Sequence, residues 1–188
     1  IIHQVALVAL PILAAVIFHE VAHGAMALRL GDDTASRLGR LTLNPLPHID
    51  PVGTILMPVL LLLAGAPIFG YARPVPVNYS QLRNPRRDMV LVALAGPGTN
   101  IVLAILSAIA LRLLAPYVSD LSPDADSLIV TGVLFPLAQM AHLSVIINVS
   151  LAVFNLLPLP PLDGGRVLTG LLPYPQARMV AAIEPFGF

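Results

Sequence analysis

The sequence contains no cysteine, no lysine and no tryptophan, and only 11% of its 188 residues are charged. Without cysteine, disulfides and thiolate metal sites are excluded, so any metal must be held by nitrogen and oxygen ligands. Soluble domains carry about 25% charged residues, whereas this chain is 57% hydrophobic with a mean hydropathy of +0.87. We therefore predict an integral membrane protein. Its formal net charge of zero gives no indication of nucleic-acid binding.

Four apolar runs approach or exceed the roughly 20 residues that a helix needs to cross a bilayer. They cover residues 5–30, 52–69, 89–115 and 127–157. The fold class that they predict is an all-α membrane protein, a polytopic transmembrane helix bundle forming a single core over residues 1–188. Because the sequence does not begin with methionine, we expect the chain to be a fragment at both ends.

The run at residues 52–69 is short and interrupted by two prolines and a glycine, so it either crosses the membrane or re-enters on the same face. Arginines concentrate in cytoplasmic loops. The loop at 116–126 has three aspartates and no basic residue, whereas the loop at 70–87 has four arginines. If 52–69 is a re-entrant hairpin, every arginine except Arg112 lies on the cytoplasmic side. This charge asymmetry favours the hairpin.

The first apolar run contains His-Glu-Val-Ala-His at residues 19–23. Residues four apart share a helix face, so His19 and His23 can direct their imidazoles at one metal ion. Glu20 lies next to them, where a general base is needed, and the three residues form the H-E-x-x-H pattern of zinc proteases. A charged carboxylate at bilayer depth costs about 2.5–3.5 kcal/mol on insertion scales. We therefore prefer a functional role to two core histidines and a stray glutamate.

A catalytic zinc site requires a third protein ligand. The candidates in this chain are His48, Asp50, Asp88, His142, Asp163 and Glu184. Asp163 follows a proline-rich break at 158–161 and precedes two glycines, which allow the backbone to approach a metal closely. Taken alone, Asp163 could equally be a helix cap or the partner of Arg166. Beside an H-E-x-x-H motif within the membrane, it becomes the leading third ligand.

Two short stretches, residues 40–43 and 74–77, are predicted as short β segments. An edge strand in either place could hold an unwound substrate by strand addition. A plain structural hairpin is the alternative.

The chain resembles the site-2 proteases, the intramembrane zinc metalloproteases of peptidase family M50. That family pairs H-E-x-x-H in one transmembrane helix with N-x-x-P-x-x-x-L-D-G near the end of another, and residues 155–164 match the second pattern in full. Its G-P-x-x-N element matches at residues 96–100. The stretches at 39–45 and 73–78 are similar to those of the compact prokaryotic branch, in which the histidine helix comes first.

The resemblance implies one zinc ion per chain, bound by His19, His23 and Asp163, with Glu20 as general base. It implies an endopeptidase that cleaves membrane-anchored proteins in or near their transmembrane segments. The expected location is the prokaryotic inner membrane, with the active site toward the cytoplasm. Transmembrane substrates and the bilayer are the expected partners. We expect Asn155 to hold the substrate or stabilise an oxyanion. Further candidates beside the site are Asn148, Asn100 and His48.

Two other functions compete with proteolysis. A membrane metal transporter could use the same three ligands as a transit site, but such proteins often contain an inverted repeat, and none is visible in this sequence. An inactive family member could bind substrates without cutting them. The intact Glu20 argues against that interpretation.

Overall fold

The computed structural model describes residues 2–66, 70–119 and 129–182, and within these ranges the regular structure is entirely helical. Three helices are long and apolar enough to span a membrane. They are α1 (Ile2–Arg29), α4 (Pro85–Ser119) and α5 (Phe135–Asn155), the last preceded by a π-helical turn, Val130–Leu134. The prediction of an all-α fold with helices able to span a membrane is confirmed for the described residues.

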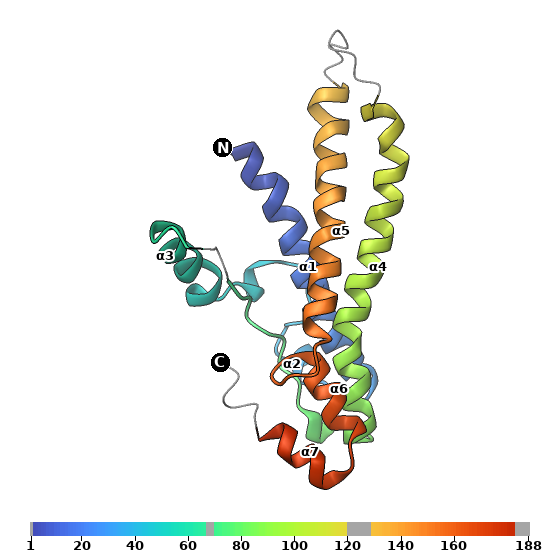
Figure 1. The fold of residues 1–188 in the computed structure, drawn as a ribbon. Helices are drawn as coiled ribbons and strands as arrows, with labels where there is room; N and C mark the ends of the chain where they lie inside the picture. Colours follow the sequence, from blue (N-terminus) through green and yellow to red (C-terminus); the bar gives the residue numbers. More distant parts are fainter. Residues whose placement is uncertain (1, 67–69, 120–128, 183–188) are drawn as a thin grey trace.

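Helix α4 is the centre of the bundle, because it packs against α1, α5 and α6 (Asp163–Leu171), while α1 also packs against α5 (Figure 1). Small side chains at helix contacts let membrane helices approach closely. The buried apolar residues of the three long helices are accordingly mostly alanines: Ala15, Ala27, Ala93, Ala104, Ala138 and Ala152. Large apolar residues such as Leu106 and Leu113 are exposed, as suits contact with lipid.

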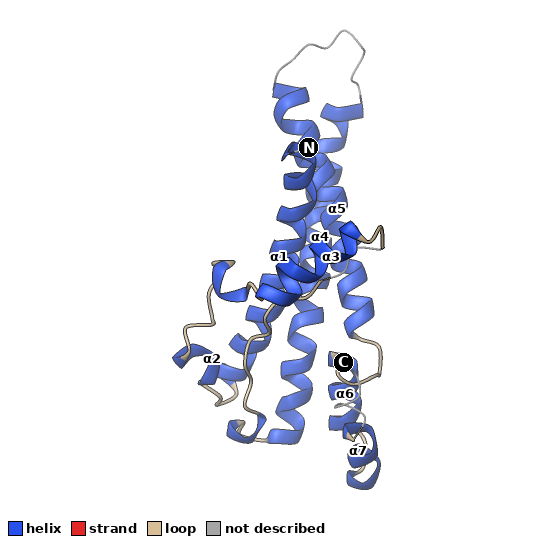
Figure 2. Ribbon diagram, turned by 90° about the vertical axis from the view of Figure 1, so that its left-hand side faces the viewer, coloured by secondary structure: helices blue, strands red, loops and turns tan. Residues whose placement is uncertain are grey.

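The short helices α2 (Thr34–Arg37), α6 and α7 (Tyr174–Ala181) gather at one end of the bundle (Figures 1 and 2). A sharp turn after α5 folds α6 back toward α4. Gly164 makes this turn possible, since a Cβ atom there would lie 2.3 Å from the carbonyl oxygens of Leu156 and Leu157. We expected the glycines after Asp163 to approach a metal. Instead Gly164 approaches the backbone of the turn.

The run at residues 52–69 contains a π-helical turn, Pro51–Leu56, followed by α3 (Met57–Leu63). This helical stretch is too short to span a bilayer, and Figure 1 shows α3 set apart from α4 and α5. The two ends of the run meet. The amide of Tyr71 donates to the carbonyl of Gly53 at 3.1 Å, and the Thr54 hydroxyl donates to the carbonyl of Tyr71 at 2.9 Å. Residues 67–69 lie outside the described ranges.

The predicted strands at 40–43 and 74–77 are not formed, and both stretches are irregular loops. The physical reason is the pair of prolines, Pro74 and Pro76, which remove two of the donors that a strand ladder requires. A side chain joins the two loops instead. The guanidinium of Arg40 donates to the carbonyls of Arg73 and Pro74 at 2.9 and 3.2 Å.

Asp32 fixes the loop after α1 to residues 73–78. Its side chain is buried, and its two oxygens accept from the amides of Thr34 at 2.9 Å and Asn78 at 2.6 Å. Burial raises the pKa of the Asp32 carboxyl, but hydrogen bonds from Thr34 and Asn78 outweigh this effect and hold the pKa below its ordinary value. Asp32 therefore stabilises the fold as a carboxylate.

Replacing Asp32 with Asn is expected to destabilise the protein by about 1–3 kcal/mol, since the new NH₂ group would face a backbone donor in a buried place. Thermal unfolding in detergent at neutral pH measures the loss. Because the folded-state pKa is lowered, the stabilisation is present above about pH 4 and is lost as the pH falls through the folded-state pKa. The matched control is Asp33→Asn, whose partner Arg37 is largely exposed. Equal shifts in the two variants would contradict the prediction.

Candidate metal centre

Three side chains from two helices converge near the end of the bundle that carries α6. His19 and His23 lie one turn apart on α1, and Asp163 is the first residue of α6. The two Nε2 atoms are 3.0 Å apart, and Asp163 Oδ2 lies 3.2 and 3.3 Å from the Nε2 atoms of His19 and His23. Ligand atoms around a tetrahedral zinc ion are separated by about 3.3 Å, given bond lengths of 2.0–2.1 Å. The spacing therefore suits a shared cation.

The other ring nitrogen of each imidazole has an oxygen partner. His19 Nδ1 donates to Asn100 Oδ1 at 2.6 Å, and His23 Nδ1 donates to the carbonyl of Val92 at 2.7 Å. With the protons on Nδ1, the Nε2 lone pairs face the common point. This is the arrangement in which metal-binding histidines are usually held.

Asn100 itself is oriented by its neighbours. Its Nδ2 donates to the carbonyl of Ala15 at 3.2 Å and to Asn148 Oδ1 at 2.7 Å, so its oxygen must face His19. Asn148 is buried and donates to the carbonyl of Ser144 at 2.8 Å. Asn148 thus supports Asn100 from behind.

Asp163 Oδ2 is buried and accepts no hydrogen bond within the described chain. An ionised carboxylate facing two imidazole lone pairs needs a positive charge between them, so the donor set fits a divalent cation such as zinc. The alternative partner of Asp163 is engaged elsewhere. Arg166 donates to the hydroxyl of Tyr79 at 2.8 Å, and its guanidinium lies 5.4 Å from the centre of the Tyr79 ring.

Gly96 on α4 lies directly against the imidazoles. A Cβ atom at this position would lie 2.3 Å from His23 Nε2 and 2.7 Å from His19 Cε1. Only a glycine lets α4 pass this close to the edges of the rings that face the metal. The Gly-Pro pattern in the sequence identified this residue. The steric reason for a glycine at this position is visible only in the structure.

Gly96→Ala is therefore expected to displace the imidazoles and to lower zinc affinity at least tenfold, comparable to the loss of an outer-shell partner. Competition with a chromogenic chelator measures the change. Gly98→Ala is the matched control, because a Cβ atom there meets nothing within 4 Å. Equal zinc affinity in the two variants would contradict the steric argument.

Glu20 is half-buried one residue beyond His19, and its Oε2 accepts a hydrogen bond from the amide of Val75 at 2.7 Å. Neither this amide nor the carbonyl of Val92 was identified from the sequence. Both are backbone groups, which every residue carries, so no sequence signal distinguishes them.

The remaining candidates lie in other settings. Asn155, at the end of α5, donates to the carbonyl of Leu151 at 3.0 Å. His48 is buried in a 3₁₀ turn, Leu46–His48, and donates from Nε2 to the carbonyl of Thr42 at 2.9 Å. The structure therefore shows neither side chain at the convergence point of the three ligand atoms.

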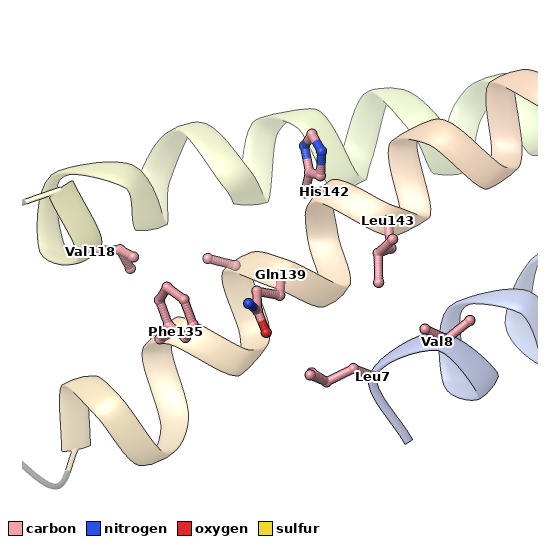
Figure 3. A pocket seen from close by; sticks show the side chains of 8 residues that line it. Leu7, Val8, Val118, Phe135, Gln139, His142 and Leu143 are labelled. Carbon is pink, nitrogen blue, oxygen red and sulfur yellow. The ribbon is translucent and has the colours of Figure 1, made fainter. Parts of the chain in front are cut away.

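The other candidates for the third ligand have separate roles. Asp50 accepts from the amides of Val52 and Gly53, and Asp88 accepts from the amide of Asn84. His142 lines a different cavity, together with Leu7, Phe135 and Gln139 (Figure 3). Glu184 lies outside the described residues.

Comparison with known proteins finds one family model, described as peptidase family M50, which matches residues 123–183. Among curated proteins, YwhC of Bacillus subtilis (strain 168), which is named as a zinc metalloprotease, is 42% identical over 170 residues. Rip2 of Mycolicibacterium smegmatis and Rip2 of Mycobacterium tuberculosis, also named as zinc metalloproteases, are 32% and 33% identical over 171 and 175 residues. No solved structure matches significantly.

These alignments cover most of this chain but less of the relatives. The match to YwhC spans 90% of this chain and 71% of YwhC. The matches to the two Rip2 proteins span 90% and 93% of this chain, but only 59% and 60% of their lengths. The similarity thus includes both the histidine helix and the segment that carries Asp163.

Proposed function

This chain belongs to peptidase family M50, the site-2 protease family of zinc metalloproteases, and we propose that it cleaves peptide bonds in or near the transmembrane segments of membrane-anchored proteins. One observation carries the proposal. The H-E-x-x-H histidines lie on α1, a helix apolar enough to span a membrane, and they meet Asp163, the first residue of α6, at a metal-sized spacing. A protease site on such a helix has membrane-embedded peptide as its nearest substrate.

The chain's own residues have separable roles in this reaction. His19, His23 and Asp163 would hold one zinc ion per chain, which supplies a Lewis acid that polarises the scissile carbonyl and acidifies water. Glu20 would take the proton from the attacking water and return it to the leaving nitrogen. Among the described residues Asn155 bonds only the Leu151 carbonyl, which leaves its second N–H and its oxygen open, and we assign it to holding the substrate or its oxyanion.

A transmembrane helix hides its peptide bonds, so the substrate must unwind before cleavage. We propose that the loops at 40–43 and 74–77 contact the unwound stretch. The second loop borders the site, because the amide of Val75 is bonded to Glu20. Proline has no N–H, so this loop offers mainly carbonyl groups for hydrogen bonds with a substrate strand.

For residues 52–69 we propose a hairpin that enters and leaves the membrane on one face. The contacts of Gly53 and Thr54 with Tyr71 support it, since a segment whose ends touch cannot cross the bilayer. With this topology the positive-inside rule places the metal centre toward the cytoplasm. In a prokaryote the host bilayer would be the inner membrane.

The proposal is tested with purified protein in liposomes and a panel of single-span peptides. Mass spectrometry of the products should locate the cut in or near the transmembrane segment, and a chelator should abolish the reaction until zinc is restored. Cuts confined to water-soluble peptides would overturn the intramembrane assignment. A zinc-bound protein that cuts nothing in the panel would favour a transporter or a non-cleaving scaffold.

A further inference from the structure

The loop formed by residues 73–78, called here the crossing loop, passes over the general base and is held at three points. Its first amide, from Arg73, donates to the carbonyl of His48 at 2.9 Å. Its last amide, from Asn78, donates to the buried carboxylate of Asp32. Between them, the amide of Val75 donates to Glu20 Oε2 at 2.7 Å. The crossing loop is therefore fixed on both sides of its contact with Glu20.

The opposite side of the same peptide group is also bound. Arg40 Nη2 donates to the carbonyls of Arg73 and Pro74, at 2.9 and 3.2 Å. The Pro74 carbonyl and the Val75 amide belong to one planar peptide unit. This unit thus joins the guanidinium of Arg40 to the carboxylate of Glu20.

Packing alone would also keep the loop in place, since Val75 is buried and its Cγ1 atom would lie 2.7 Å from a Cβ atom on Gly24. Packing does not, however, require an amide to meet one particular carboxylate oxygen. With Oε2 engaged by Val75, the orientation of the Glu20 carboxylate is restricted, and Oε1, which has no hydrogen-bond partner among the described residues, can accept a proton. A general base must lie within hydrogen-bond reach of the proton that it removes.

We propose that the Pro74–Val75 peptide unit is a positioning group for Glu20, and that Arg40 is a positioning residue that acts through it. The proposal rests on the proposed function of this site. It makes no use of the metal, because the contacts run from Arg40 through backbone atoms to Glu20.

The first test removes the amide. Val75→Pro deletes the N–H while keeping a side chain of similar size, and Val75→Ala keeps the N–H while trimming the side chain. A misplacement of about 1 Å can cost around 100-fold in rate. We expect kcat of the proline variant to lie at least tenfold below that of the alanine variant, with KM and zinc content alike in the two.

The second test removes the guanidinium. Arg40→Met should lower kcat, whereas Arg37→Met should leave it within about threefold of wild type, because the exposed Arg37 guanidinium contacts Asp33 and Gln81 outside the crossing loop. Interactions within one connected unit are not additive. The double variant Arg40→Met with Val75→Pro is therefore expected to be no slower than Val75→Pro alone.

A spectroscopic measurement separates this proposal from the proposed function. In protein labelled with ¹⁵N-valine, the Val75 amide proton should resonate downfield and move upfield in Glu20→Ala. If wild type cleaves but the proline and alanine variants have equal kcat, the positioning role is wrong. Higher activity in either Val75→Pro or Arg40→Met would also overturn it, by showing that the loop obstructs the site. If the wild-type protein cleaves nothing and its Val75 amide proton is not shifted downfield, both the proposed function and this positioning role are wrong.

Discussion

Glu20→Gln is expected to abolish proteolysis while leaving zinc binding intact. The amide side chain has nearly the same shape as the carboxylate, and its oxygen can still accept the hydrogen bond from Val75. It cannot accept the proton of an attacking water. General bases contribute roughly 10²–10⁴-fold to rate, so kcat should fall by at least that order. Cleavage of a transmembrane peptide in liposomes, followed by gel and mass spectrometry, measures the loss.

The zinc content of the same preparation is the necessary control, because a loss of metal would explain inactivity without involving a base. We expect wild type and Glu20→Gln to bind equal amounts of zinc, since Glu20 is not among the three converging ligand atoms. Asp33→Asn serves as the matched control for removing a carboxylate, as the Asp33 side chain is half-exposed beyond the end of α1. Cleavage by Glu20→Gln within tenfold of wild type would show that another group acts as the base.

The three helices apolar enough to span a membrane were predictable because their signal is local. The length of an apolar run can be counted in the sequence and compared with the thickness of a bilayer. The spacing of the two histidines in H-E-x-x-H places them on one face of a helix. The convergence of Asp163 with the histidines is a long-range contact, yet the chemistry of an incomplete zinc site singled out this carboxylate. A zinc site with two histidines needs a third protein ligand, and the sequence offers few candidates for it.

The strand predictions failed for a physical reason that was present in the sequence. Pro74 and Pro76 alternate with valines, so the side-chain pattern indicated an extended chain, but the missing donors prevent a ladder. What joins the two loops is the side chain of Arg40, and this contact depends on tertiary placement. Backbone partners such as the Val92 carbonyl and the Val75 amide could not be predicted, because any residue supplies them.

Asp163→Asn is expected to cause the largest loss of zinc among single substitutions outside α1. The change replaces a charged ligand by a neutral amide in a buried place beside two imidazoles. Outer-shell partners of metal sites typically contribute 10–100-fold in affinity, and the loss of a direct ligand should exceed that range. Zinc affinity is measured by competition with a chelator of known strength, and cleavage is followed in the same preparation.

The matched control is Asp88→Asn, which makes the same chemical change at another buried carboxylate, one that accepts from the amide of Asn84 instead of facing histidines. Both variants lose a charge in the protein interior, so both should lose stability. Only Asp163→Asn should lose zinc, because only its oxygen meets the two Nε2 atoms. Equal zinc affinity in Asp163→Asn and wild type would assign the third ligand elsewhere. His19 and His23 would then form an incomplete site, and the buried Asp163 oxygen would need another partner.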